Sequence, residues 1–182
     1  KVCSEDMLWQ MSVTISDVDD RERLGTKLSY GFNRTYTKLE SGELFNDGFL
    51  SGYVYALNSQ IRKFFNLSEE TKFIRTRFDM TTYKGEETFT FSPHVDIDGE
   101  HLTSIFYFHT TDAPTVLYNE ITDFPDFIDK SKLTVMEEVE CIENRVIIFY
   151  GKHIHSGKSL TSGPRRILMN TNFSIPPETL EN

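Results

Sequence analysis

The chain has few cysteines and little positive charge. Its 182 residues include only two cysteines, Cys3 and Cys141, which excludes a disulfide framework and a zinc site built from cysteine pairs. Sparse cysteine favours a reducing, cytoplasmic location. The formal net charge of −9 argues against sequence-independent binding to nucleic acid or to an anionic membrane, because both need clustered positive charge.

Long apolar runs and internal boundaries are also missing. No stretch approaches the roughly 18 apolar residues of a membrane span, and residues 1–6 lack the basic start and apolar core of a signal peptide. No repeat, low-complexity tract or linker divides the chain. We therefore expect one domain over residues 1–182, with an N-terminal region of helix and edge strands over 1–70, a β core over 71–173 and an exposed tail over 174–182.

One stretch near the N-terminus has helical periodicity. Between residues 41 and 66, apolar side chains recur at every fourth position, namely Phe45, Phe49, Tyr53, Leu57, Ile61 and Phe65. This spacing places them on one stripe of an amphipathic helix, and we expect that stripe to pack on the outside of a sheet. Weak strand patterns precede the helix near 8–15 and 28–38.

After residue 70 the pattern is that of strands. Fifteen Phe and eight Tyr suit strands better than a helical bundle. Seven segments separated by turn residues read as strands: 71–83, 87–95, 102–109, 115–120, 132–142, 145–150 and 165–173. Because no helical pattern separates them, we expect antiparallel sheets in a mainly β, jelly-roll fold with one or two N-terminal helices on its outside.

Two histidine-bearing stretches are candidates for a metal site. His94 and Asp96 are two residues apart at the end of a predicted strand, so both side chains can point into the same interior. They would supply two ligands of a two-histidine, one-carboxylate iron site. The third can come from His153 or His155, which follow an apolar run and have the same strand parity. Asp98 is a poor substitute for Asp96, because the motif places the carboxylate two residues after the histidine.

The C-terminal part of the chain favours an anion site. No acidic residue occurs between Asn144 and Pro177, whereas Arg145, Lys152, Lys158, Arg165 and Arg166 occur there. A local charge of +5 in an acidic protein indicates an anion site rather than a general basic surface. Arg165 or Arg166, at the start of the last predicted strand, can hold a carboxylate bidentately. On strand parity, Arg166 shares its face with Leu168, Asn170 and Asn172.

In this order, the histidine–carboxylate pair, the distal histidine and the arginine resemble the Fe(II)/2-oxoglutarate-dependent dioxygenases. The similarity is greatest to small, single-domain prolyl-4-hydroxylase-like members of bacterial and phage type, and it covers about residues 80–173. The resemblance implies a double-stranded β-helix, cupin-like in its barrel, with iron held by His94, Asp96 and His155. Family spacing favours His155 over His153 and Arg166 over Arg165.

The resemblance also implies further roles. Arg166 would pair with the distal carboxylate of 2-oxoglutarate, Tyr107 would hydrogen-bond it, and Tyr83 would be a second pocket tyrosine. Residues 113–115 depart from the family, which often has a glycine pair there. Loops near 84–88, 97–101 and 110–114 are candidates for the substrate rim.

The implied activity is hydroxylation of a C–H bond with release of succinate and carbon dioxide. Its cofactors would be Fe(II) and 2-oxoglutarate, with O2 as cosubstrate and ascorbate as an auxiliary reductant. The substrate could be a prolyl or other peptide residue, or a small molecule, and no nucleic acid or membrane partner is expected. Two alternatives are a cupin-like metal-binding protein without oxygenase activity and a jelly roll whose histidines are incidental.

Overall fold

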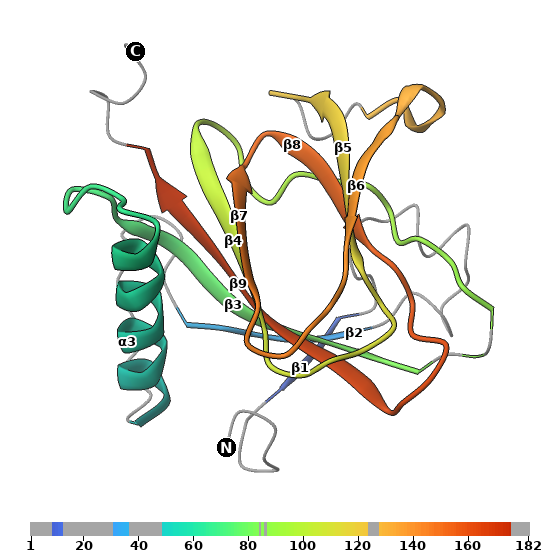
Figure 1. Ribbon diagram of the computed structural model, residues 1–182, viewed down its shortest axis with the longest axis horizontal. Helices are drawn as coiled ribbons and strands as arrows, with labels where there is room; N and C mark the ends of the chain where they lie inside the picture. The colour runs from blue at the N-terminus through green and yellow to red at the C-terminus, as the bar shows by residue number, and fades with distance from the viewer. Residues whose placement is uncertain are drawn as a thin grey trace.

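The strands form two antiparallel sheets that face each other (Figure 1). The computed structural model describes residues 9–12, 31–36, 49–83, 85, 87–123 and 128–175. The larger sheet has the order β1-β2-β3-β9-β4-β7, with strands Gln10–Ser12 (β1), Gly31–Thr35 (β2), Phe73–Thr82 (β3), Arg165–Ser174 (β9), His101–Tyr107 (β4) and Val146–Tyr150 (β7). The smaller sheet has the order β6-β5-β8, with strands Val135–Val139 (β6), Thr115–Ile121 (β5) and His153–Gly157 (β8). A short 3-10 turn, η1 (Lys130–Lys132), precedes β6. The fold is the mainly β jelly roll that the sequence predicts.

One helix, α3 (Phe49–Phe64), lies against the larger sheet on the face away from the smaller sheet (Figure 1). Its buried Val54 and Ile61 belong to one apolar cluster with Phe78 of β3 and Met169 of β9. Burial of each such side chain stabilises the fold by roughly 1.5–3 kcal/mol. The predicted helix over 41–66 is confirmed from residue 49 onward, and residues 41–48 lie outside the described residues. Asn66, at φ 52°, follows its C-terminus in the left-handed conformation that asparagine tolerates.

A buried polar cluster also joins the helix to the sheet. Asn58 of α3 donates to Thr76 of β3 at 3.0 Å and accepts from Thr171 of β9 at 2.9 Å. All three residues are fully buried, and each polar group is satisfied within the cluster. This cluster fixes the position of the helix along the two central strands.

β9 separates the helix side of the sheet from the interior. Its odd-numbered residues Ile167, Met169 and Phe173 join the cluster beneath the helix. Its even-numbered residues Arg166, Leu168 and Asn170 line a cavity between the two sheets. This alternation is the pleat of a ten-residue strand, and it delivers polar side chains to the interior as strand parity predicts.

The segment 87–95 is predicted as a strand but forms only two isolated bridges, Thr90 with Lys158 and His94 with His155. Pro93 lies between them and has no N–H for a ladder hydrogen bond, so regular pairing is interrupted. The segment nevertheless runs along β8 and continues the smaller sheet. β8 itself is not among the predicted strands, because His-Ile-His-Ser-Gly has only one aliphatic residue.

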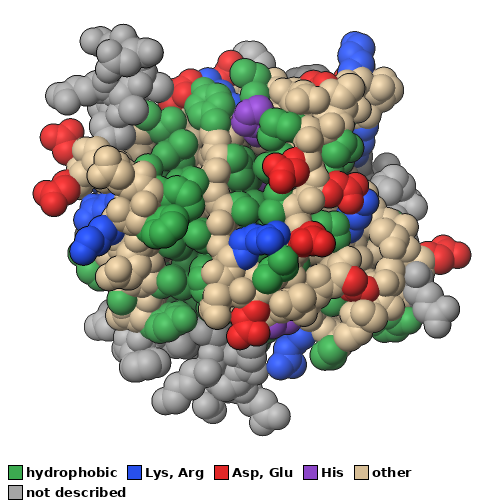
Figure 2. All heavy atoms as spheres, viewed as in Figure 1, with side chains coloured by type: hydrophobic (Ala, Val, Ile, Leu, Met, Phe, Trp, Pro, Cys, Tyr) green, Lys and Arg blue, Asp and Glu red, His purple; other side chains and the backbone are tan. Residues whose placement is uncertain are grey.

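The described surface mixes charges of both signs. Figure 2 shows basic side chains in small separate groups among acidic ones on the visible face. Within the described residues, no helix has the length and apolar character needed to cross a membrane.

Candidate active site

His94 and His155 face each other across adjacent segments of the smaller sheet. The two residues exchange both backbone hydrogen bonds, each at 2.9 Å, so they form a directly opposed antiparallel pair. Their imidazole rings are therefore neighbours, with centroids 4.6 Å apart. The fold thus brings together two histidines that are sixty-one positions apart in the sequence.

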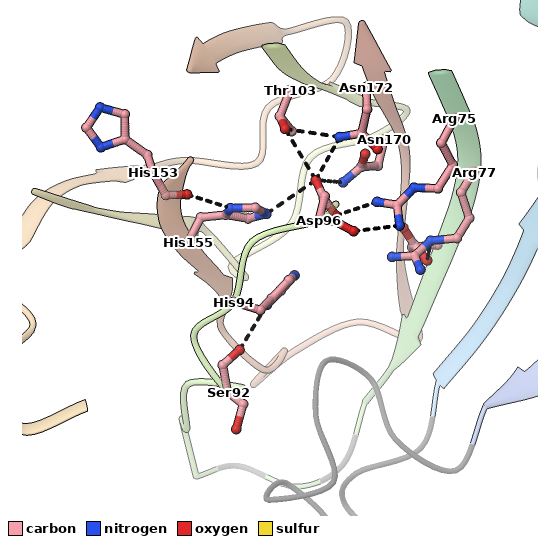
Figure 3. Close-up of polar contacts among 11 residues, drawn as sticks. Arg75, Arg77, Ser92, His94, Asp96, Thr103, His153, His155, Asn170 and Asn172 are labelled. Atoms are coloured by element: carbon pink, nitrogen blue, oxygen red, sulfur yellow. Dashed lines mark hydrogen bonds and ion pairs between the residues drawn. The ribbon is translucent and has the colours of Figure 1, made fainter. Parts of the chain in front are cut away.

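The backbone fixes which ring nitrogen of each histidine is available to a ligand. Nδ1 of His94 donates to the carbonyl of Ser92 at 3.0 Å, and Nδ1 of His155 donates to the carbonyl of His153 at 3.1 Å (Figure 3). A carbonyl oxygen can only accept, so Nδ1 carries the proton in both rings. Nε2 of each is left as the acceptor, which is the state a metal-binding histidine requires.

Asp96 completes a cluster of three possible metal ligands. One ligand atom from each of His94, Asp96 and His155 lies within 4.8 Å of the others, and Nε2 of His155 is 3.6 Å from Oδ2 of Asp96. Two histidines and one carboxylate suit a divalent first-row metal such as Fe(II). The residues present therefore fit the metal that the sequence motif implies.

The carboxylate of Asp96 is held by four side chains from the larger sheet (Figure 3). Arg75 of β3 donates to Oδ1 at 2.6 Å and to the backbone carbonyl of Asp96 at 3.1 Å. Oδ2 accepts from Asn170 at 2.9 Å and from Asn172 at 3.1 Å, with Thr103 at 3.4 Å. Arg75 thus engages one oxygen, while the other faces His155.

This environment sets the protonation states of the ligands. Burial by itself would raise the pKa of Asp96, but the Arg75 guanidinium, with smaller contributions from His155 and His94, holds that pKa well below its usual range. Burial, together with the charge of His94, lowers the pKa of His155 to about 4. At neutral pH the cluster therefore consists of a carboxylate and a neutral His155, both in the form that binds a metal.

His153 does not join the cluster. Its Nδ1 donates to the carbonyl of Tyr118 at 3.0 Å, and its ring contacts Tyr150. Figure 3 shows its ring pointing away from Asp96. Strand parity gives no distinction between His153 and His155, but the two differ in position along β8, because His155 is directly opposite His94 whereas His153 is opposite Ile121 of β5.

Arg166 lies in the same cavity as the metal-ligand cluster. The cavity is lined by His94 and His155 at one place and by Arg166 and Thr115 at another, with Ile105 and Leu168 among the apolar lining residues. Arg166 is only 5% exposed, and its Nη2 donates to Thr115 Oγ1 at 2.8 Å. Among the described residues no carboxylate pairs with it, and its Nε is buried without a hydrogen-bond partner. A buried guanidinium without a counter-charge is costly, so the cavity favours an anionic ligand.

The aromatic ring of Tyr107 packs against the Arg166 guanidinium. The Arg166 guanidinium lies 5.6 Å from the centroid of the Tyr107 ring, a cation–π contact. The Tyr107 hydroxyl donates to Thr115 Oγ1 at 2.8 Å, and burial raises the pKa of Tyr107, which keeps that donor protonated. Thr115 Oγ1 therefore accepts twice and retains its own hydrogen for a ligand oxygen.

The other candidates lie elsewhere. Arg165 is exposed, and its carbonyl accepts from His109 Nε2 at 3.0 Å. Tyr83 is 42% exposed and does not line the cavity. The described residues of the three predicted rim loops do not line it either, whereas Gly31–Asn33 of β2 and residues 77 and 79–81 of β3 do.

The basic character of the C-terminal segment has several origins. Lys152 pairs with Glu100 and Asp123, Lys158 pairs with Glu138 at 2.6 Å, and Arg145 lies 4.0 Å from Glu140. These acids come from outside the acid-free segment, so three of its five cations belong to surface ion pairs. An anion site in this segment therefore depends on Arg166 alone.

Sequence reasoning gives no role to Arg75, Asn172, Asn170 or Thr115. One signal for the first was present: Arg75, Arg77 and Asp79 alternate along a predicted strand, which indicates a charged face. On strand parity, Asn170 and Asn172 share the face of Arg166. Nothing in the sequence joins either asparagine to Asp96, because that contact depends on how the loop before β4 folds back.

Solved structures of low sequence identity share this fold. An oxidoreductase of the 2OG-Fe(II) oxygenase family from Burkholderia pseudomallei aligns with a TM-score of 0.62 at 13% identity, over 93% of this chain and 74% of that one. The non-heme α-ketoglutarate-dependent epimerase SnoN from nogalamycin biosynthesis aligns with a TM-score of 0.59 at 12% identity, over 92% and 77%. A prolyl-4-hydroxylase from Pseudomonas putida aligns at 0.47 and 12% identity, over 92% of both chains. No protein-family model and no curated protein matches the sequence.

The chain therefore shares its fold with solved structures that are named as 2-oxoglutarate- and Fe(II)-dependent enzymes, and the mainly β fold predicted from its sequence is confirmed.

Proposed function

We propose that this protein is an Fe(II)- and 2-oxoglutarate-dependent dioxygenase. His94, Asp96 and His155 would hold the metal, and Arg166 would bind the distal carboxylate of 2-oxoglutarate with help from Thr115 and Tyr107. Residues 1–182 would form one such oxygenase domain. Sparse cysteine favours a cytoplasmic setting for it.

The observation that carries the proposal is a buried arginine, without a carboxylate partner among the described residues, in the cavity of a His-Asp-His cluster. A site that only bound metal would not need Arg166, because Arg75 already neutralises Asp96. A dianionic 2-oxo acid would satisfy both ends of the cavity, with its oxo acid end at the metal and its distal carboxylate on the guanidinium. Burial of Arg166 would then strengthen the binding of 2-oxoglutarate, although it lowers the stability of the ligand-free protein.

The bound metal and 2-oxoglutarate would supply the activation of O2, and the protein would bind, orient and exclude water. The reaction consumes a C–H bond, O2 and 2-oxoglutarate and yields C–OH, succinate and carbon dioxide, with one oxygen atom in each oxidised product. Apolar residues around the ligands, among them Phe91, Ile105 and Leu168, limit water near the reacting centre. Ascorbate would serve as an auxiliary reductant. The candidate substrates are a prolyl or other residue of a peptide, or a small molecule.

A cupin-like protein that binds metal without oxidation is the second candidate. The same three ligands favour it, and Arg166 weighs against it. The two candidates differ in one product, succinate.

The test is to measure succinate from 2-oxoglutarate in air, with Fe(II), for the unmodified protein and two matched variants. We expect slow succinate release without added substrate, its loss in His155→Ala, and no change in His153→Ala, whose ring lies outside the cluster. Metal binding without succinate in the unmodified protein would favour the cupin-like alternative.

A further inference from the structure

A second ion pair lines the cavity and has no part in the proposed binding of metal or cosubstrate. Nε of Arg77 lies 2.8 Å from Oδ1 of Asp79, and both residues line the cavity that contains His94 and Arg166. Each side chain is about a quarter exposed, at 25% and 24%. Among the described residues, the terminal nitrogens of Arg77 and the second carboxylate oxygen of Asp79 make no hydrogen bond.

The pair lies apart from the end of the cavity that Arg166 occupies. On β3, Arg77 is opposite Asn170 of β9, whereas Thr81 is opposite Arg166. Four residues of strand separate Arg77 from Thr81, about 13 Å at 3.3 Å per residue. Figure 3 shows Arg77 extending from β3 beside Arg75, across the site from His155. A 2-oxo acid between the metal and Arg166 would therefore leave Arg77 next to the metal and unused.

The free atoms of the pair define the ligand that would complement them. Arg77 is bound to Asp79 through Nε, so its two terminal nitrogens form a planar fork that suits a carboxylate. The free oxygen of Asp79 can accept from an ammonium group. Because the pair is neutral as a whole, a simple anion would gain little from it, whereas a ligand with both charges would match both atoms.

We propose, building on the oxygenase function above, that the substrate is a free amino acid whose carboxylate binds Arg77 and whose ammonium binds Asp79. A residue inside a peptide has neither charge, so this site disfavours the peptide alternative. Asn33 of β2, opposite Asp79 in the register, lines the same part of the cavity and adds a polar group. Leu168 of β9, opposite Asp79 in the register, lines the same cavity and offers apolar surface to the substrate side chain.

The experiment measures binding directly, by saturation-transfer NMR on protein loaded with Zn(II), with and without 2-oxoglutarate. The probes are the twenty free L-amino acids and, for each that binds, its N-acetyl form, its amide and its des-amino acid. We expect at least one free amino acid to bind. Its amide and N-acetyl forms should bind at least about tenfold more weakly, since each leaves a charged side chain of the pair without its partner.

Two variants assign the charges. Arg77→Gln should remove the preference for the acid over the amide, and Asp79→Asn should remove the preference for the amino acid over its des-amino form. Both should leave the affinity for 2-oxoglutarate within about twofold, because Arg166 holds that ligand. Lys158→Gln, which breaks a surface ion pair with Glu138, is the matched control. Thermal melting checks folding, and the double variant Arg77→Gln/Asp79→Asn keeps the pair neutral if a single variant does not fold.

Three results would overturn the proposal. One is 2-oxoglutarate binding with no bound amino acid, which would leave the oxygenase function standing. Another is equal binding of the free, amide and N-acetyl forms. The third is weakened 2-oxoglutarate binding in Arg77→Gln, which would place Arg77 in the cosubstrate site. Failure of 2-oxoglutarate itself to bind the unmodified protein counts against the proposed function, and amino-acid binding is read separately with Zn(II) alone.

Discussion

Replacement of Arg166 by methionine separates cosubstrate binding from stability. Arg166 is 5% exposed, and its guanidinium has Thr115 and the Tyr107 ring as its neighbours and no carboxylate among the described residues. Loss of one partner of a buried charge pair costs about 2–5 kcal/mol, which raises the Kd for 2-oxoglutarate by at least about 30-fold at 1.4 kcal/mol per tenfold. In the free protein, Arg166→Met removes a buried charge that has no counter-ion in the described part of the chain. The free energy of unfolding of the variant should therefore stay within about 1 kcal/mol of that of the unmodified protein, or exceed it.

The assay is calorimetric titration of 2-oxoglutarate into Zn(II)-loaded protein, which allows binding without turnover, combined with chemical unfolding of the free protein. Arg165→Met is the matched control, because Arg165 is the adjacent residue and is exposed. An equal loss of affinity in Arg165→Met, or a change of less than about threefold in Arg166→Met, would refute the reasoning about the buried guanidinium.

Three further predictions follow from the contacts around the site. Arg75→Gln should lower the free energy of unfolding of the metal-free protein by about 3–5 kcal/mol, because it leaves the carboxylate of Asp96 buried without its charged partner. Zn(II) should raise the Tm of this variant more than that of the unmodified protein. Equal Tm shifts would contradict this prediction. Gly157→Ala places a Cβ 3.0 Å from Nη1 of Arg166, so the guanidinium must shift and 2-oxoglutarate should bind several-fold more weakly in the same titration; an unchanged Kd would show that it moves freely. The pKa of His155 is lowered to about 4, so between that value and its unfolded value near 6.5 the unfolded chain binds more protons than the folded one. Stability of the metal-free protein should therefore be full above pH 6.5 and fall by about 2 kcal/mol on acidification to pH 5, and His155→Gln should remove that part of the loss in unfolding titrations at the two pH values.

Period and parity predict most of the fold. The four-residue spacing through Tyr53, Leu57 and Ile61 predicts a helix, and two of these residues pack in the cluster beneath α3. Strand parity along β9 predicts the face shared by Arg166 and Asn170. Both predictions succeed because each depends only on local geometry.

What the sequence does not predict depends on contacts between distant segments. The segment 87–95 has the alternation of a strand, but Pro93 prevents regular pairing, and β8 lacks an apolar pattern of its own. The same limit applies to the site. His155 is distinguished from His153 by its pairing with His94, and the contact of Arg75 with Asp96 requires the segment before β4 to lie against β3.

The acid-free C-terminal segment shows how a correct conclusion can have a partly wrong basis. Its +5 charge suggests an anion site, yet Lys152 and Lys158 are neutralised by acids from distant parts of the chain. Only the buried Arg166 retains the property that the whole segment suggested. Burial and pairing, which the sequence does not show, therefore decide which cation matters.

The most direct test of the central claim is an anaerobic titration of the protein with Fe(II) and 2-oxoglutarate. Chelation of the metal by the 2-oxo acid should produce a visible charge-transfer band that requires both ligands. We expect that band in the unmodified protein and in His153→Ala, and its loss in His94→Ala. The absence of a band in the unmodified protein, or its survival in His94→Ala, would contradict the account.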